Sequence, residues 1–271
     1  SLQPSEFLKP AFIVMAAWFM SLKKARENFP CFIITGVLYC LSVTLLLLQP
    51  DFGMTFVLTS VWGAQIFLAG LPFRWVILLI VAGIGAIVMI YMSFEHVQSR
   101  VDRYFNPETG DNFQVEKSLE AFREGGVLGT GPGQGSVKLN LPDSHADFIF
   151  SVAGEEMGLV FLALIIGIYG FIIFRGLNRL ISCEDMFVVL SVGGILSMFG
   201  LQALIHMGSA MQLLPAKGMT LPFMSYGGSS LLSMGFAFGI VLALTRRSVR
   251  KGISRGCLSL QAPRSQDKVG L

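Results

Sequence analysis

Charged residues are scarce in this chain. Only 14% of its 271 residues are Asp, Glu, Lys or Arg, 53% are hydrophobic, and the mean hydropathy is +0.67. Soluble globular domains carry about 25% charged residues. This scarcity excludes a soluble domain of ordinary composition and indicates a chain whose main solvent is the lipid bilayer. Cysteine is scarce too: Cys31, Cys40, Cys183 and Cys257 are expected within the bilayer or on its cytoplasmic side, so no disulfide is predicted.

Long stretches of the chain contain no charged residue at all. A helix that rises about 1.5 Å per residue needs roughly 20 apolar residues to cross about 30 Å of hydrocarbon. Six stretches meet this requirement: 28–50, 52–73, 75–94, 157–174, 186–216 and 218–245. A shorter stretch, 7–20, with Glu6 and Lys9 at its start, forms a seventh candidate. We therefore predict an all-α fold, a polytopic transmembrane helical bundle with seven spans.

Basic residues mark alternate ends of these spans. They are Lys23, Lys24 and Arg26 after the first span, Arg74 after the third, Arg175 and Arg179 after the fifth, and Arg246, Arg247, Arg250 and Lys251 after the seventh. By the positive-inside rule these ends and the C-terminus are cytoplasmic, and residue 1 lies outside. Because the chain begins with Ser1 inside a polar motif, we expect it to be part of a longer protein. Residues 255–271 are polar without apolar periodicity and are expected to be a disordered cytoplasmic tail.

One long polar loop, residues 93–146, separates the fourth and fifth spans and lies outside in this topology. A loop of this length is usually functional or disordered, and its aromatic residues favour function. Residues 114–124 are expected to form a short amphipathic helix, and a glycine series follows at 125–135. The series matches no nucleotide-binding motif. Two interpretations stay open: a flexible turn, or a backbone whose amides meet a pyrophosphate.

Asp147 opens the fifth span, close to Asp143 and His145. An acid at this position is either a helix cap or a functional group at the membrane surface. Glu155 and Glu156 follow eight and nine residues later, which on a straight helix places them about 12–13 Å deeper. Acids inside a membrane usually mark a functional path, although pairing with Lys9 or capping of an interrupted helix is an alternative.

The stretch 214–230 holds two prolines and three glycines between the last two spans and predicts a re-entrant or tight outer loop. Its only charge is Lys217. A lone ammonium at a membrane surface is more often a snorkelling anchor than a ligand group, and both roles stay open.

Five motifs, in this order along the chain, resemble the SEDS family of bacterial cell-wall polymerases, whose members include FtsW, RodA and SpoVE. They are Leu-Gln-Pro-Ser-Glu-Phe-Leu-Lys at 2–9, Gln-Pro-Asp-Phe-Gly at 49–53, His-Ala-Asp-Phe-Ile-Phe at 145–150, Gly-Glu-Glu-Met-Gly at 154–158 and Leu-Pro-Phe-Met-Ser-Tyr-Gly-Gly-Ser-Ser at 221–230. The resemblance implies a ten-span protein with three spans before this chain, residues 1–254 being its transmembrane domain. Residues 215–220 are more similar to the division members than to RodA. Two departures are His206, where the family pattern has Asn, and a loop before Pro142 that is one residue short.

The resemblance also implies an activity. The protein would be a peptidoglycan glycosyltransferase in the bacterial cytoplasmic membrane that polymerises lipid II on the outer face during cell division. Asp147 would act as the general base in an inverting attack, and the residues expected to bind substrate are Lys217, His145, Glu6, Lys9, Arg100, Arg103, Glu155, Ser225 and Ser229. A divalent cation, Mg²⁺ or Mn²⁺, is a further candidate for stabilising the leaving group. Implied partners are the growing lipid-linked glycan, a class B penicillin-binding protein and other division proteins. The alternative is a lipid II flippase or a non-catalytic scaffold.

Overall fold

The computed structural model describes residues 3–24, 30–49, 51–71, 74, 85, 92, 113–140, 145–214 and 219–260. Within these residues every regular element is helical, so the all-α prediction is confirmed for this part of the chain. The elements are α1 (Pro4–Ser21), η1 (Leu22–Lys24), α2 (Cys31–Leu48), α3 (Phe52–Leu68), α6 (Phe113–Gly125), η3 (Val137–Asn140), α7 (Ile149–Ile181), α8 (Met186–Ala210) and α9 (Gly228–Leu260).

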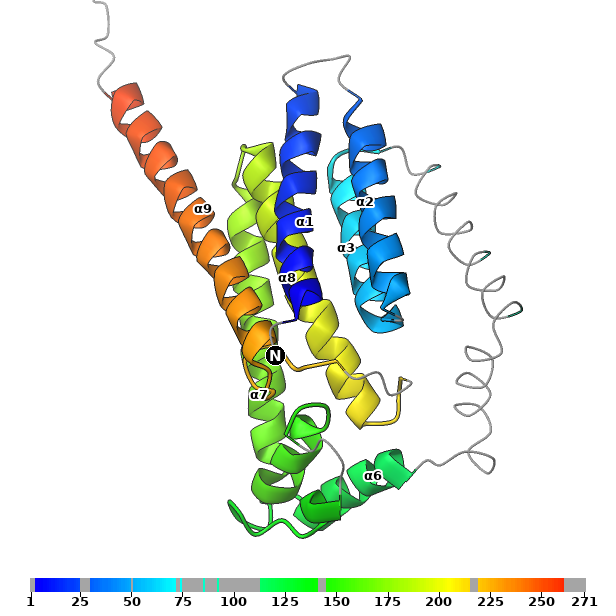
Figure 1. Ribbon diagram of the computed structural model, residues 1–271. Helices are drawn as coiled ribbons and strands as arrows, with labels where there is room; N and C mark the ends of the chain where they lie inside the picture. Colours follow the sequence, from blue (N-terminus) through cyan, green and yellow to red (C-terminus); the bar gives the residue numbers. More distant parts are fainter. Residues whose placement is uncertain are drawn as a thin grey trace, which may run out of the picture.

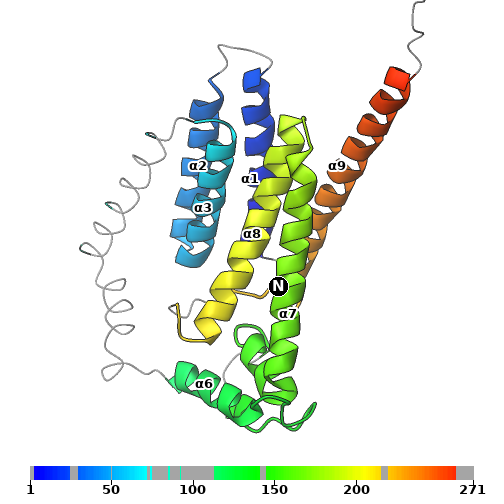
Figure 2. The same ribbon diagram turned by 180° about the vertical axis from the view of Figure 1, so that it is seen from behind.

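Helices α1, α2, α3, α7, α8 and α9 run side by side as a bundle, and the amphipathic helix α6 lies across one end of it (Figures 1 and 2). Four described helices are long and apolar enough to cross a membrane: 31–48, 149–181, 186–210 and 228–246. Helix α3 contributes a shorter apolar segment, Gly53–Leu68. The expected crossing at 75–94 lies outside the described residues, so seven spans stay a prediction.

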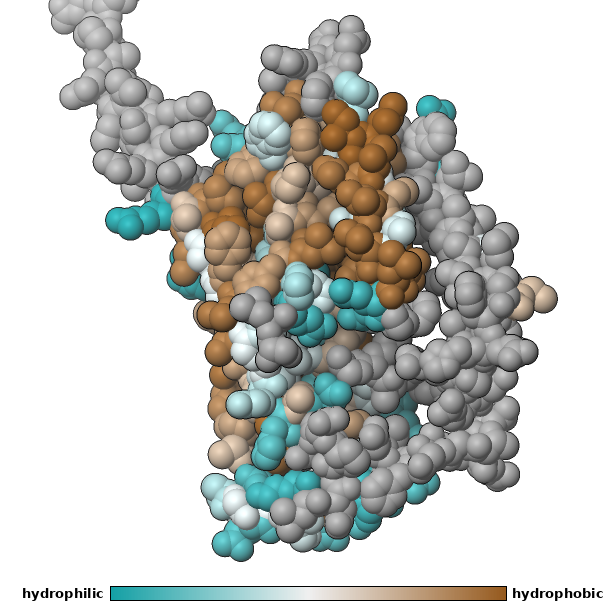
Figure 3. Space-filling view, in the orientation of Figure 1, coloured by the Kyte–Doolittle hydropathy of each residue, from teal (hydrophilic) through white to brown (hydrophobic). Residues whose placement is uncertain are grey.

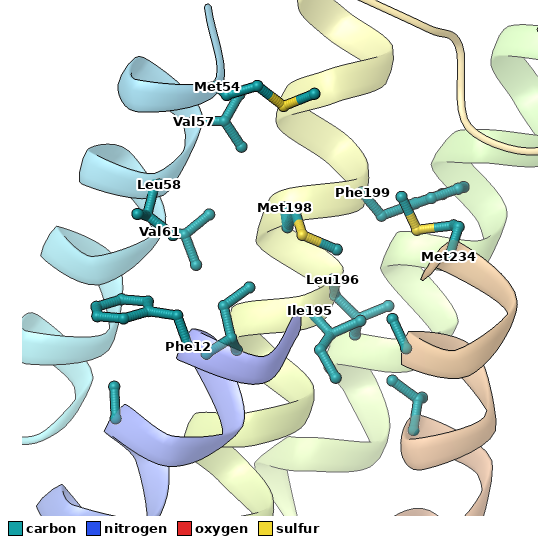
Figure 4. Close-up of a cluster of buried hydrophobic side chains, with 14 of the residues drawn as sticks. Phe12, Met54, Val57, Leu58, Val61, Ile195, Leu196, Met198, Phe199 and Met234 are labelled. Carbon is teal, nitrogen blue, oxygen red and sulfur yellow. The ribbon is translucent and has the colours of Figure 1, made fainter. Parts of the chain in front are cut away.

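Helix α8 is the centre of the bundle. Its apolar window is 78% buried, against 17–33% for the other three long helices, which leave apolar faces for lipid. The largest buried cluster joins α8 to α1, α3 and α9, with Phe12, Val57, Ile195 and Met198 among its members (Figure 4). Small residues let the backbones approach: a Cβ on Gly194 would lie 2.6 Å from Ile13 Cγ2.

The two ends of the bundle differ in polarity. Helix η1, with Lys23 and Lys24, lies at the same end as the turn 182–185 that follows Arg179 (Figure 1). Helix α6 and the turns before α3, α7 and α9 lie at the opposite end, which we call the α6 end. Hydrophobic side chains cover the bundle and hydrophilic ones gather toward the α6 end (Figure 3). The basic ends therefore cluster on one side, as the charge pattern predicts.

Two helix boundaries differ from the sequence expectation. Helix α9 begins at Gly228 rather than near residue 218, because the preceding segment, with Pro222, forms turns. It continues to Leu260, past the expected boundary at 254. Residues 261–271 of the expected tail lie outside the described residues.

Helix α7 is broken at Gly158, whose φ of 76° and ψ of −179° are non-helical. Residues 149–157 form a short first part, and residues 159–181 form the long second part. A Cβ on Gly154 would lie 3.2 Å from Leu162 Cδ1, although eight residues of straight helix span about 12 Å. The chain therefore turns sharply at the break. Glu155 and Glu156 lie before the break, in the short first part of α7, so their expected depth below Asp147 stays a prediction.

Candidate active site

Asp147 lies in a turn, residues 145–148, directly before α7 at the α6 end of the bundle. Its side chain is half-buried, and that of His145 is exposed. The backbone of this turn is held from outside: the Ala146 carbonyl accepts a hydrogen bond from Ser225 Oγ at 2.7 Å, and the His145 carbonyl accepts one from the Tyr226 N–H at 2.9 Å. The sequence placed Asp147 at this helix start but gave no sign of these two bonds.

The segment that provides both bonds is residues 219–227, which we call the Ser225 loop. Ser225 Oγ also accepts the Leu221 N–H at 2.7 Å, which closes the loop on itself. The Tyr169 hydroxyl of α7 donates to the Pro222 carbonyl and ties the loop to the bundle. The loop's backbone is thus fixed at its middle and joined to the Asp147 turn.

His206 holds the start of the Ser225 loop. Its Nδ1 lies 2.6 Å from the Met219 carbonyl oxygen, and the ring is 2% exposed. Because a carbonyl only accepts, Nδ1 carries the hydrogen. His206, which stands where the family pattern has Asn, therefore anchors the Ser225 loop to α8 through the Met219 carbonyl.

Glu6 and Lys9 form a buried ion pair on α1. Lys9 Nζ lies 2.8 Å from Glu6 Oε2, and the two residues are 1% and 4% exposed. Lys9 Nζ also lies 2.9 Å from Met54 Sδ on α3. Lys9 therefore pairs within its own helix, not with Glu155 or Glu156.

The same helix carries Pro10, four residues after Glu6. Proline has no N–H, so the Glu6 carbonyl loses its usual helical donor. Ser233 Oγ of α9 donates to that carbonyl at 2.7 Å. Pro10 and Ser233 were not predicted as contributors, although a proline four residues after Glu6 is a readable sign of a freed carbonyl.

Glu155 is fully buried and binds η3, which follows the glycine series. Its carboxylate accepts the N–H groups of Val137 and Lys138 at 2.8 and 3.0 Å, which are the first amides of η3. An acid at a helix start is a favourable arrangement. Its neighbour Glu156 pairs with Lys138 Nζ. The predicted substrate contact of Glu155 stays a prediction, but in this structure its two oxygens bind protein amides.

The glycine series docks onto the break in α7 through backbone hydrogen bonds. A broken helix leaves carbonyls and amides without partners, and this loop supplies them. The four bonds run from Thr130 N to Glu155 O (2.9 Å), Gly131 N to Glu156 O (3.0 Å), Leu159 N to Gly126 O (3.0 Å) and Val160 N to Val127 O (3.3 Å). Residues 126–128 form a turn, as the first interpretation expected, and these bonds hold the segment 126–131 against α7. Contact of this backbone with a pyrophosphate stays a prediction.

Helix α6 is fastened to the bundle beside this loop. Ser118 Oγ lies 2.6 Å from Ser151 Oγ and donates to the Ala210 carbonyl at 2.7 Å, all in buried surroundings. One hydroxyl pair thus joins α6, the short first part of α7 and the end of α8. The sequence predicted the helix at 114–124 but not this junction.

These motifs and their placement can be compared with known proteins. Residues 1–250 match the family of cell cycle proteins that comprises FtsW, RodA and SpoVE. The chain belongs to this family. It is also a multi-pass membrane protein, since its apolar helices agree with that membership.

Relatives of the FtsW/RodA/SpoVE family are similar over most of the chain. A probable peptidoglycan glycosyltransferase FtsW of Caulobacter vibrioides is 42% identical over 247 residues, which are 91% of this chain and 63% of that protein. Stage V sporulation protein E of Bacillus subtilis is 34% identical over 92% of this chain and 69% of its own length. The chain thus spans somewhat less than two thirds of the Caulobacter protein.

Two solved structures in the comparison share the fold. One, described as structural coordination of polymerization and crosslinking by a peptidoglycan synthase complex, aligns with a TM-score of 0.72 and 27% identity over 91% of this chain and 70% of its own. The other is the rod shape determining protein RodA of Thermus thermophilus, with a TM-score of 0.63 and 27% identity over 91% and 66% of the two chains.

Four of the residues singled out in the sequence lie outside the described residues, namely Arg100, Arg103, Asp143 and Lys217. Ser229 is half-buried at the start of α9. In the described part of the chain, no three His, Cys, Asp or Glu side chains gather into a metal-binding group. A divalent cation at this site stays a prediction.

Proposed function

We propose that this chain is the catalytic part of a peptidoglycan glycosyltransferase that polymerises lipid II. Three observations support the proposal: membership of the FtsW/RodA/SpoVE family, a relative that is 42% identical and named a probable peptidoglycan glycosyltransferase, and an acid at the polar end of a membrane bundle. A lipid-linked sugar needs an enzyme that receives its polyprenyl chain in the bilayer and its sugars in water.

Two hydrogen bonds hold the turn of Asp147, one from Ser225 Oγ to the Ala146 carbonyl and one from the Tyr226 N–H to the His145 carbonyl, and we call this pair the backbone clamp. This clamp is the observation that carries the assignment of a base. General bases act only when they are held within about 3 Å of the proton they remove. Glu155 and Glu156, the next acids along the chain, bind backbone amides and Lys138. Asp147 is our choice of base because its turn is held at two carbonyls at the polar end of the bundle.

The reaction that we propose is a single displacement. The 4-hydroxyl oxygen of the acceptor sugar attacks the anomeric carbon of the donor while Asp147 takes the hydroxyl proton. A new glycosidic C–O bond forms as the bond to the phosphate oxygen breaks, and the pyrophosphate departs with the electron pair. Because the leaving group needs no proton, one carboxylate suffices, and the anomeric centre inverts. Cationic groups such as Lys217, Arg100 or Arg103 would stabilise the leaving charge.

The proposed arrangement has the α6 end on the outer face of the cytoplasmic membrane. The clustering of Lys23, Lys24 and Arg179 at the opposite end supports it. A cysteine introduced at the exposed residue Ser136 tests it, since a membrane-impermeant maleimide should label that thiol in intact cells. Labelling only after lysis would show that the α6 end faces the cytoplasm.

The activity is tested with purified protein, a lipid II substrate and the Asp147→Asn and Asp147→Ala variants. The full-length wild-type protein should form polymer. In both variants the rate of polymerisation should fall by at least about 100-fold, because general base catalysis contributes that much. Lipid II binding and thermal unfolding should be unchanged. Undiminished polymerisation would favour a different base, and absence of polymer from the wild type would favour the flippase or scaffold alternative. Adding a class B penicillin-binding protein tests the partner that the family resemblance implies.

A further inference from the structure

We propose that Ser225 is a positioning residue for the Asp147 base. The inference rests on the proposed function and goes beyond it, because it replaces a predicted substrate contact of Ser225 with a role inside the protein. The carrying observation is the pair of hydrogen bonds at Ser225 Oγ, one to the Ala146 carbonyl and one from the Leu221 N–H.

The hydroxyl of Ser225 has its donor role filled. A serine hydroxyl has one hydrogen and two lone pairs. The hydrogen goes to the Ala146 carbonyl, which lies 79 residues away in sequence, and one lone pair receives the Leu221 amide. Nothing remains to be donated to a sugar or phosphate oxygen unless the clamp opens. The geometry therefore favours an internal role over substrate binding.

The Ser225 loop is stiff enough to act as an anchor. Phe223 has a φ of 65°, a region that bulky residues rarely occupy and that persists only where the surroundings enforce it. Its ring lies 6.2 Å from that of Phe199 and 5.2 Å from that of Phe238. Tyr169, which stacks on Phe199 at 5.0 Å, donates to the neighbouring Pro222 carbonyl. Three helices, α7, α8 and α9, therefore contact the loop at Pro222 and Phe223, just before Ser225.

Ala146 immediately precedes Asp147, so its carbonyl belongs to the peptide group that carries the Asp147 N–H. Holding that carbonyl fixes the peptide plane from which the Asp147 side chain leaves. A misplacement of about 1 Å at a reacting group costs on the order of 100-fold in rate. Loss of the Ser225 hydroxyl should therefore lower the rate of the chemical step more than it weakens substrate binding.

The experiment compares Ser225→Ala, Ser225→Thr and Ser225→Cys in the full-length protein with lipid II as substrate. Ser225→Ala should lower kcat by about 10- to 100-fold and change KM by less than about twofold. Ser225→Thr, which keeps the hydroxyl, should restore most of kcat, and Ser225→Cys should lie between. The matched control is Ser42→Ala on α2, a buried residue whose hydroxyl donates, within the described part of the chain, to the Leu38 carbonyl of its own helix. The kcat of this variant should equal that of the wild type.

A second readout needs no turnover. Amide hydrogen exchange in residues 145–150 should accelerate in Ser225→Ala and not in Ser42→Ala, because only the former frees the Asp147 turn. An unchanged kcat together with unchanged exchange would overturn the inference, as would a raised KM with kcat intact, which is the signature of direct substrate binding. If Ser225→Ala does not fold, Ser225→Cys decides by the same criteria. If the wild type makes no polymer, the proposed function fails, and the exchange result alone then confirms or overturns the clamp.

Discussion

Ser233 on α9 donates its hydroxyl hydrogen to the backbone carbonyl of Glu6 on α1, at 2.7 Å and in buried surroundings. The two residues are 227 positions apart in sequence. The contact exists because Pro10 has no N–H to give to that carbonyl. A side chain of one helix thus completes the backbone hydrogen bonding of another, at the level of the buried Glu6–Lys9 pair. Inside a bilayer no water molecule is available to donate a hydrogen bond to such a carbonyl.

Ser233→Ala should therefore destabilise the protein through the Glu6 carbonyl. An unsatisfied buried backbone group costs about 1–3 kcal/mol. In a Pro10→Ala background the helix regains the missing N–H, so the cost of Ser233→Ala should fall toward zero. Thermal unfolding of the four proteins of this double-mutant cycle in detergent measures the coupling.

The control for this cycle is Thr245→Ala. Thr245 is a buried residue of the same helix whose hydroxyl donates to the Val241 carbonyl of that helix. The stability lost in Thr245→Ala should be the same whether position 10 holds proline or alanine. An equal cost of Ser233→Ala in both backgrounds would show that Ser233 does not act through the carbonyl freed by the proline.

Removing one partner of the Glu6–Lys9 pair should be strongly destabilising. Breaking a buried ion pair leaves an uncompensated charge and typically costs about 3–5 kcal/mol. Lys9→Met should show this loss, and Lys9→Met combined with Glu6→Gln should recover most of it. The chain offers a matched control in Lys117→Met, because Lys117 and Glu120 have the same i,i+3 spacing in a partly exposed position on α6. That variant should lose less than about 1 kcal/mol. Equal shifts of Tm for Lys9→Met and Lys117→Met would contradict the burial argument.

Local signals in the sequence predict the helices well. The amphipathic run at 114–124 became α6, and the start of α8 at Met186 follows Glu184 and Asp185 as the charge pattern requires. Charge distribution also predicted that the basic helix ends share one side. These features depend on neighbouring residues along the chain, so a pattern in the sequence carries them.

Features that depend on a distant partner could not be predicted. Gly158 lies in an apolar stretch that reads as a span, yet it breaks α7 where the backbone of Gly129 approaches it. Glu155 and Glu156 are identical in type, but the fold turns one toward amides of η3 and the other toward Lys138. The roles of such residues follow from tertiary contacts. The sequence pointed to Asp147 as a candidate base without revealing the loop that holds its turn.

Glu155→Ala should loosen the loop between α6 and the Asp147 turn. The buried amide of Val137 loses its acceptor at a cost of about 1–3 kcal/mol, and the part-buried amide of Lys138 loses its acceptor at a smaller cost. Limited trypsin digestion measures the effect, since cleavage after Lys138 should be faster than in the wild type. Glu155→Gln, which keeps one acceptor oxygen, should show a smaller increase. Glu124→Ala, which removes an exposed glutamate of α6, is the control and should leave cleavage unchanged. If Glu155→Ala were cleaved no faster than this control, the carboxylate would not be what holds η3.

Gly158→Ala should disrupt the break in α7. Any residue with a Cβ is strained at a φ of 76° and a ψ near 180°, at a cost of about 1–3 kcal/mol. The added Cβ would also lie 2.4 Å from the Gly129 amide nitrogen, so the glycine series would have to move away from the helix. Gly167→Ala in the long second part of α7 is the matched control, because its Cβ meets no atom within 4 Å and alanine favours a helix by up to about 1 kcal/mol. We expect Gly158→Ala to lower Tm in detergent and to expose the 126–131 segment to amide exchange, while Gly167→Ala leaves both unchanged or raises Tm. Equal stability of the two variants would mean that the glycine series does not depend on the break for its position.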